Sequence, residues 1–132
     1  MKQLIAVMTL LLAMPVLAEI QTKAVEYEHE GAKLTGHLYW DDAKEGMGPG
    51  VMVVHEWWGL NDYAKKRARM LAEAGYVAFA ADMYGDGKVT DKPAQAKEWM
   101  LEVTADVEGW QERAALGLEQ LKMSGLVDPQ RM

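Results

Sequence analysis

The sequence has 132 residues, 50% of them hydrophobic and 26% charged, with a formal net charge of −6. This length suits one small domain, and the balance of apolar and charged residues is typical of a globular protein. The acidic charge argues against a nucleic-acid partner, and the lack of cysteine excludes disulfides, thiolate metal sites and lipid-modified cysteines within these residues.

Residues 1–18 have the pattern of a signal peptide. Lys2 supplies a positive charge, residues 4–12 are apolar apart from Thr9, and Ala18 is a small residue at the position after which a signal peptidase cuts. The apolar stretch of about fifteen residues is shorter than the roughly 20 that cross a bilayer as a helix. We therefore predict export to the periplasm or outside the cell, with cleavage after Ala18 and no membrane attachment afterwards. The alternative is an uncleaved membrane anchor.

Two strands joined by a tight turn are predicted next, over residues 20–29 and 34–40. Polar and apolar residues alternate in the first strand, so that one face carries Val25, Tyr27 and His29. Gly31 suits the turn of a hairpin. His29 and His37 flank this turn, and we expect both at the surface.

A strand, a helix and a second strand follow. Residues 51–54 and 76–81 are continuous apolar runs, typical of parallel strands buried on both faces. Asn61 is a suitable cap for the helix between them, and Gly75 ends it. The segment therefore predicts a right-handed βαβ unit.

The remaining residues predict two helical stretches after a loop at residues 82–90. Pro93 suits a first helical turn, and Gly109 either separates two helices or kinks one. The expected apolar stripes are Ala96, Trp99, Met100 and Val103, then Val107, Trp110, Ala114, Leu118 and Leu121. A crossover of this length should lead to another parallel strand, which would begin near Arg131.

The most informative segment is His55-Glu56-Trp57-Trp58-Gly59, directly after the first buried strand. In open α/β sheets, ligands bind beyond the carboxyl ends of the strands, so Glu56 is a candidate for chemistry. The alternative is that Glu56 caps the following helix or pairs with Lys65 or Lys66.

No cofactor or metal site is expected. A helical zinc-protease motif needs a second histidine four residues after His55, where Gly59 stands. Gly85 and Gly87 lack the third glycine of a dinucleotide-binding loop.

Residues 51–61, 68–75 and 76–84 resemble the dienelactone hydrolase family. The segments Gly36-His37-Leu38-Tyr39-Trp40 and Asp128-Pro129-Gln130-Arg131-Met132 are also similar to it. The resemblance implies an α/β fold in which residues 19–132 form the N-terminal half of an α/β-hydrolase domain: a β-hairpin, a βαβ unit and a helical crossover, with the nucleophile strand absent.

The resemblance also implies roles for residues at the strand ends. Glu56 matches a glutamate that helps to activate the nucleophile, and the backbone N–H of Trp57 matches one oxyanion-hole donor. Trp58 is a candidate for substrate binding or for packing. Tyr84 either lines the pocket or closes its loop over the core.

The nucleophile of the family stands in a glycine-flanked cysteine or serine elbow, which this sequence lacks. Ser124 is the one serine, and it has neither a preceding strand nor flanking glycines on both sides. By resemblance, we expect a hydrolase that acts on a small ester, lactone or related carbonyl compound through an acyl-enzyme, inactive as the 132 residues alone. The alternatives are a non-catalytic exported binding or interaction domain and an unrelated flavodoxin-like module.

In the fold that the resemblance implies, the strand at residues 51–54 pairs along one edge with the nucleophile strand. Without that partner, an apolar edge would be open to other chains. We therefore expect residues 19–132 alone to be insoluble or only partly folded.

Overall fold

The computed structural model describes residues 19–132, so the predicted signal peptide lies outside the described residues. The described chain forms a four-stranded sheet and three helices. In chain order the elements are β1 (Ile20–His29), β2 (Ala32–Asp41), β3 (Gly50–Val54), α1 (Asp62–Glu73), β4 (Val77–Ala81), α2 (Pro93–Ala105) and α3 (Val107–Met123). This order confirms the predicted hairpin, βαβ unit and helical crossover.

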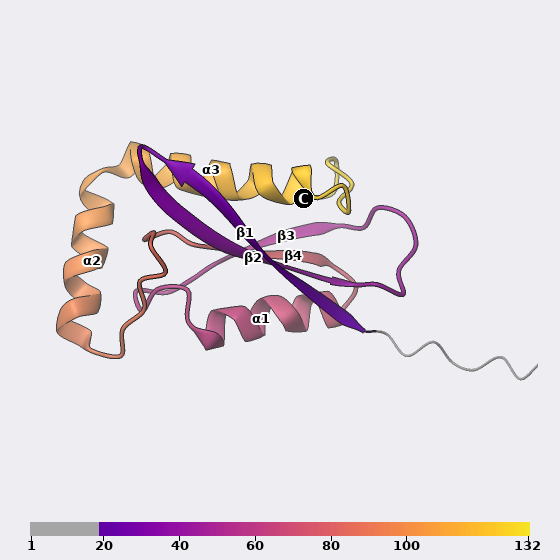
Figure 1. The fold of residues 1–132 in the computed structure, drawn as a ribbon, viewed down its shortest axis with the longest axis horizontal. Coiled ribbons are helices and arrows are strands. Elements are labelled where there is room, and N and C mark those ends of the chain that lie inside the picture. Colours follow the sequence, from indigo (N-terminus) through magenta and orange to yellow (C-terminus); the bar gives the residue numbers. More distant parts are fainter. Residues whose placement is uncertain (1–18) are drawn as a thin grey trace, which may run out of the picture.

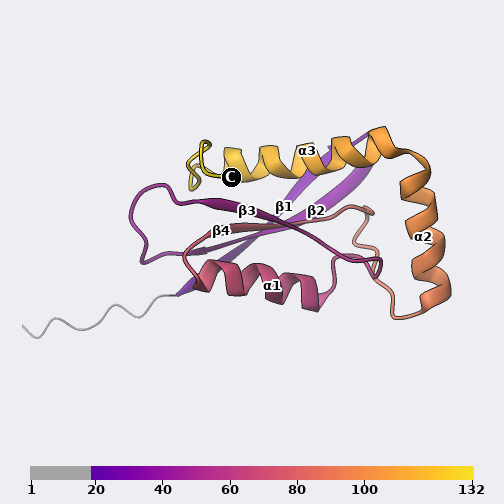
Figure 2. The same ribbon diagram turned by 180° about the vertical axis from the view of Figure 1, so that it is seen from behind.

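The sheet is sandwiched between two helices. Its strand order is β1-β2-β4-β3, with β3 and β4 parallel and the other neighbours antiparallel. Helix α1 covers one face and α3 the other, while α2 lies across one end (Figures 1 and 2). This end is the one where β3 and β4 finish, so α2 and the two strand ends belong to the same region of the molecule.

Strand β4 is the centre of the core because all five of its residues are buried. Its side chains alternate between two apolar clusters, as the period of a strand requires. The cluster beneath α3 contains Leu38, Val77, Phe79, Ala81, Met83, Leu121 and Val127. The cluster beneath α1 contains Tyr39, Leu60, Ala64, Ala68, Ala72, Ala78 and Ala80. The prediction that this strand is buried on both faces is confirmed.

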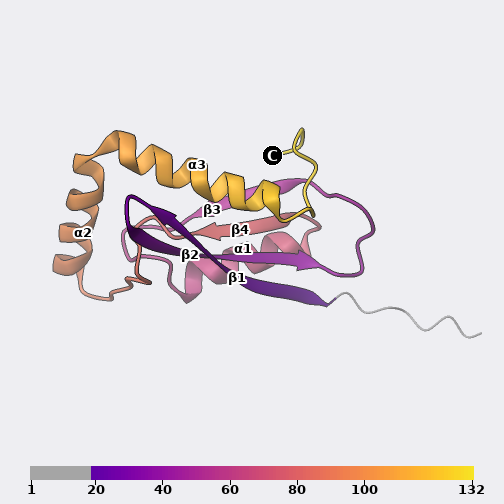
Figure 3. The ribbon, with the colours of Figure 1, turned by 45° about the horizontal axis from the view of Figure 1, so that its top comes forward.

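Strand β3 differs from its prediction. It pairs with β4 as expected, but Val51 to Val53 are only half-buried and Val54 is 45% exposed. Its outer edge is paired only at the start, where the Gly50 N–H donates to the Arg131 carbonyl at 2.8 Å. The C-terminal end lies beside this part of the strand (Figure 3). The expectation of burial on both faces was wrong for β3 because, within residues 19–132, no strand covers that edge.

The helix boundaries follow from local capping. The Asn61 side chain accepts from the Ala64 N–H at 3.1 Å, and α1 begins at the next residue, as predicted. The break between α2 and α3 falls at Asp106, whose carboxylate accepts from the Gly109 N–H, so Gly109 lies inside the first turn of α3. Val107 and Trp110, expected in the apolar stripe, are exposed. None of these helices in the described part of the chain is long and apolar enough to cross a membrane.

Candidate active site

The loops that follow β3 and β4 meet at one edge of the sheet. Gly59 and Val89 form an antiparallel bridge, and the Thr90 N–H donates to the Trp58 carbonyl at 3.0 Å. The parallel pairing of the strands brings both loops to this edge, where ligands bind in open α/β sheets.

Gly59 allows the loops to approach this closely. Its φ is +87°, in the left-handed region that favours glycine. A Cβ atom here would stand 2.0 Å from the carbonyl oxygen of Lys88. The contact between the two loops therefore requires glycine at this position.

His55 connects the ends of the two strands. Its ring is buried, with 9% of the residue exposed. Its Nδ1 lies 2.6 Å from the Glu56 carbonyl oxygen, and its Nε2 accepts the Met83 N–H at 3.1 Å. Burial lowers the pKa of His55, and the bond to the Glu56 carbonyl and the charge of Asp82 only partly oppose this effect. The neutral imidazole therefore joins the loop after β3 to the loop after β4.

Tyr84 holds the peptide between Trp57 and Trp58 in the loop after β3. Its hydroxyl donates to the Trp57 carbonyl at 2.9 Å, and its ring lies edge-on to His55 at 4.8 Å between centroids. The residue is buried, and its ring also meets Trp99 at 5.9 Å. Tyr84 thus closes its loop over the core and at the same time supports the loop after β3.

Asp82 shapes the loop that carries Tyr84. One carboxylate oxygen accepts from the N–H groups of Tyr84 and Gly85, at 3.1 and 2.8 Å. The other accepts from the Thr35 N–H of β2 at 3.2 Å. Asp82 is 1% exposed, so this buried carboxylate has its oxygens satisfied by backbone donors.

Glu56 and Trp57 occupy the tip of the loop after β3. The Glu56 side chain is exposed and forms no ion pair or hydrogen bond within residues 19–132. Pairing with Lys65 or Lys66 is therefore not seen, and Asn61 rather than Glu56 caps α1. The Trp57 N–H likewise donates no hydrogen bond to the described residues.

The two tryptophans pack against each other, with ring centroids 5.1 Å apart and planes at 65°. Trp57 is 36% exposed, and Trp58 is half-buried. The four residues singled out by sequence, Glu56, Trp57, Trp58 and Tyr84, therefore belong to one connected group at the strand ends. Their catalytic and binding roles stay predictions.

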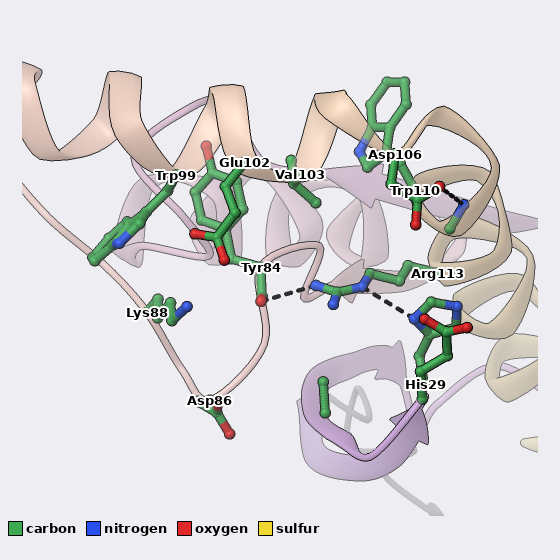
Figure 4. Close-up of a pocket in the computed structure, with 13 residues that line it drawn as sticks. His29, Tyr84, Asp86, Lys88, Trp99, Glu102, Val103, Asp106, Trp110 and Arg113 are labelled. Atoms are coloured by element: carbon green, nitrogen blue, oxygen red, sulfur yellow. Dashed lines mark hydrogen bonds between the residues drawn. The ribbon is translucent and has the colours of Figure 1, made fainter.

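A second polar cluster ties the hairpin to α3 (Figure 4). His29 Nε2 lies 2.9 Å from a Glu112 carboxylate oxygen, and Arg113 Nε donates to His29 Nδ1 at 3.4 Å. The Arg113 guanidinium also donates to the carbonyls of Met83 and Tyr84 at 3.0 and 2.9 Å. His29 is only 6% exposed, so its expected place at the surface was wrong. Helix α3 covers it.

A cleft of about 280 Å³ lies beside this second cluster. Figure 4 shows Tyr84, Lys88, Trp99, Glu102 and Arg113 around it. Tyr84 lines this cleft and also reaches the loop after β3, because its hydroxyl donates to the Trp57 carbonyl while its backbone carbonyl accepts from Arg113.

Sequence reasoning missed the supporting residues His55, Asp82 and Arg113. The spacing of Asp82 and Gly85 is a signal for a side-chain-capped turn, and it was available in the sequence. His55 was considered as a zinc ligand, for which the second histidine is missing at Gly59. No local pattern pointed to Arg113, since its partners lie about thirty residues away in the chain.

Comparison with known proteins places this site in a family. The family model described as the dienelactone hydrolase family matches residues 35–132. The chain belongs to the dienelactone hydrolase family. The matched range contains both strand-end loops, so the residues of the candidate active site lie inside the family domain.

Individual dienelactone hydrolase relatives agree with this assignment. The protein usf of Aquifex pyrophilus is 42% identical over 82 residues, which is 60% of this chain and 34% of that protein. The solved structure named m3DLH is 37% identical with a TM-score of 0.80, over 85% of this chain and 47% of that one. A dienelactone hydrolase-like promiscuous phosphotriesterase from metagenomic libraries is 38% identical with a TM-score of 0.78, over 83% and 46%.

The chain thus spans about a third of the length of that curated relative and about half the length of each solved structure. The similarity shows the fold of the described residues, which correspond to part of the dienelactone hydrolase fold.

Proposed function

We propose that the protein is a hydrolase of the dienelactone-hydrolase type, which cleaves an ester, a lactone or a related carbonyl compound through an acyl-enzyme. The observation that carries this proposal is the Trp57 peptide at the end of β3. Its N–H has no hydrogen-bond acceptor among residues 19–132, while the carbonyls of Glu56 and Trp57 on either side are held by His55 and Tyr84. Family membership supplies the reaction class.

In this mechanism the Trp57 N–H serves as an oxyanion-hole donor. A nucleophile adds to the substrate carbonyl carbon, and the π-electron pair moves onto the carbonyl oxygen. A fixed N–H stabilises this developing charge, and removing one such donor costs about 3–4 kcal/mol of transition-state stabilisation. When the resulting tetrahedral intermediate collapses, the carbonyl re-forms and the alkoxide of the substrate leaves and takes up a proton. Water then hydrolyses the acyl-enzyme.

Glu56 is proposed to accept the proton of the nucleophile. It stands directly before Trp57, so the base and the oxyanion donor belong to adjacent residues. Its carboxylate has no cationic partner within residues 19–132, which leaves its oxygens free to accept a proton.

The nucleophile itself is proposed to come from polypeptide beyond residue 132. The chain has no cysteine, and the Ser124 hydroxyl is engaged at the end of α3, donating to the Leu121 carbonyl at 2.6 Å and accepting from the Leu126 N–H at 3.2 Å. Val127 forms a parallel bridge with Gly48, just before β3. A strand continuing in this direction would run along the open edge of β3 and present its end beside Glu56.

The test uses the full-length protein, meaning the complete gene product that contains these residues. We expect it to hydrolyse p-nitrophenyl acetate and a dienelactone, and Glu56→Gln to lower kcat about 100-fold or more without changing thermal stability. Glu45→Gln is the matched control, because Glu45 is also exposed but lies in the β2–β3 loop. An inactive full-length protein would favour the non-catalytic binding domain.

Export is part of the proposal and rests on the pattern of residues 1–18. Expression of the full-length protein in a Gram-negative host should yield a periplasmic or secreted form whose first residue is Glu19. N-terminal sequencing and intact mass measure this directly. A protein that retains Met1 and sediments with the membranes would show an uncleaved anchor instead.

A further inference from the structure

The two ring nitrogens of His55 have opposite hydrogen-bonding duties. The Glu56 carbonyl oxygen carries no hydrogen, so Nδ1, 2.6 Å away, must be the donor. The Met83 N–H is itself a donor, so Nε2, 3.1 Å away, must be the acceptor. The partners therefore select the neutral tautomer with its proton on Nδ1. With both nitrogens occupied, the ring is not free to act as an acid or base.

The bond from His55 acts on the direction of a neighbouring donor. A trans peptide is planar, and its C=O and N–H point in opposite directions. The Glu56 carbonyl and the Trp57 N–H belong to the same peptide. Two donors reach the Glu56 carbonyl, His55 Nδ1 at 2.6 Å and the Gly59 N–H of the same turn at 3.3 Å, and His55 makes the shorter contact. By holding this carbonyl, His55 turns the Trp57 N–H of the same peptide the opposite way.

We propose that His55 is a positioning residue that fixes the direction of the Trp57 N–H as an oxyanion-hole donor. This inference rests on the proposed function. His55 fastens the peptide on the N-terminal side of Trp57, and the Tyr84 hydroxyl fastens the peptide on its C-terminal side at 2.9 Å. Both side chains are buried and in edge-on contact, so the donor is oriented by a support that is anchored in the loop after β4.

Burial keeps this support in its working state. The pKa of His55 is lowered chiefly by loss of hydration, so the ring stays neutral at physiological pH. Protonation would place a hydrogen on Nε2, which then could no longer accept from the Met83 N–H. The link to the loop after β4 would be lost while the Nδ1 donor remained.

Two substitutions separate the two halves of this support. His55→Asn places an amide N–H near the position of Nδ1 and keeps the donor to the Glu56 carbonyl. His55→Gln places its amide near the position of Nε2, keeping the acceptor for the Met83 N–H and losing the donor to Glu56. Both variants are uncharged and polar, so they differ mainly in which bond they preserve.

We expect His55→Gln to lower kcat of the full-length enzyme about 10- to 100-fold with little change in KM, because a misdirected donor acts on the transition state. His55→Asn should retain kcat within about threefold, since the donor direction survives. Equal turnover in the two variants, or wild-type turnover in His55→Gln, would overturn the proposal.

A second measurement needs neither activity nor a variant that folds. In full-length protein with 15N-labelled histidine, the NMR shifts of His55 should report a protonated Nδ1 and an unprotonated Nε2. The opposite tautomer would overturn the proposal, even if a variant fails to fold. A full-length protein with the expected tautomer but no hydrolase activity would refute the proposed function, and with it the catalytic consequence of the support.

Discussion

Two buried histidines, His55 and His29, lie on either side of the loop that carries Tyr84, and they are used in opposite ways. His55 donates from Nδ1 and accepts at Nε2, and both of its partners are backbone groups. His29 accepts at Nδ1 from Arg113, which leaves Nε2 as the donor to Glu112, so both of its partners are side chains. The donor nitrogen is therefore Nδ1 in His55 and Nε2 in His29.

The two histidines therefore have different roles: His55 orients a peptide, and His29 joins two secondary-structure elements. The bonds of His55 set the directions of backbone groups at the strand ends, where chemistry is proposed. The bonds of His29 tie the end of β1 to α3, and they act on the site only through Arg113, which holds the Met83 and Tyr84 carbonyls. The same residue type thus supports orientation in one region and stability in the other.

The largest effect is expected where the loops of the active-site region touch. Gly59→Ala should lower the free energy of unfolding by about 3 kcal/mol or more, because the left-handed backbone is strained by a Cβ and the new atom meets the Lys88 carbonyl oxygen. Gly31→Ala is the control in the hairpin, with φ +79° and nothing within 4 Å of its Cβ. Chemical denaturation measures both, and equal losses would show that backbone strain alone accounts for Gly59.

The next effect tests the connection between the two regions. Arg113→Ala leaves the Met83 and Tyr84 carbonyls and His29 Nδ1 without their donor, and should lower the free energy of unfolding by about 2–3 kcal/mol. Arg67→Ala, at an exposed residue of α1, should change it by less than about 0.5 kcal/mol. If both variants unfold alike, Arg113 does not brace the loop after β4.

A smaller effect separates the two histidines directly. His29→Gln keeps a donor for Glu112 and loses the acceptor for Arg113, so stability should fall by about 1 kcal/mol. Turnover of the full-length enzyme should not change, in contrast to His55→Gln. Should kcat fall in His29→Gln as well, the division between an orienting and a joining histidine would not hold.

The smallest expected effect is a pH dependence of stability that arises from His55. Burial lowers its folded pKa below the ordinary value of 6.5, so the unfolded chain binds the proton more tightly. The contribution of neutral His55 to the free energy of unfolding is therefore fully present above pH 6.5 and is lost as the pH falls below this value.

The groups that bear on this ring are the Asp82 carboxylate, whose charge raises the pKa, and the edge-on Tyr84. We expect the free energy of unfolding to fall less steeply from pH 7 to pH 5 in His55→Asn than in the wild type. The pKa of His37 is also lowered by burial, but this contribution is common to both proteins and cancels in the difference. Identical slopes would mean that His55 titrates as in the unfolded chain.

The order of the elements could be predicted because each has a local cause. The alternating residues of β1, the apolar run of β4 and the Asn61 cap of α1 are all visible within a few neighbouring positions. The position of the break between α2 and α3 could not be predicted in this way. The sequence pointed to Gly109, whereas the break falls at Asp106. Asp106 caps α3 through the Gly109 N–H, so the two residues belong to the same turn.

The sequence by itself determined the hairpin, the βαβ unit, the helical crossover and the position of Glu56, Trp57, Trp58 and Tyr84 at strand ends, because periodicity and strand boundaries are properties of neighbouring residues. Only the tertiary structure decided that His29 is buried, that β3 has an open edge, and which nitrogen of each histidine carries the proton. Those outcomes depend on partners far away in the chain, 28 residues from His55 to Met83 and 84 from His29 to Arg113, and no local pattern records such contacts.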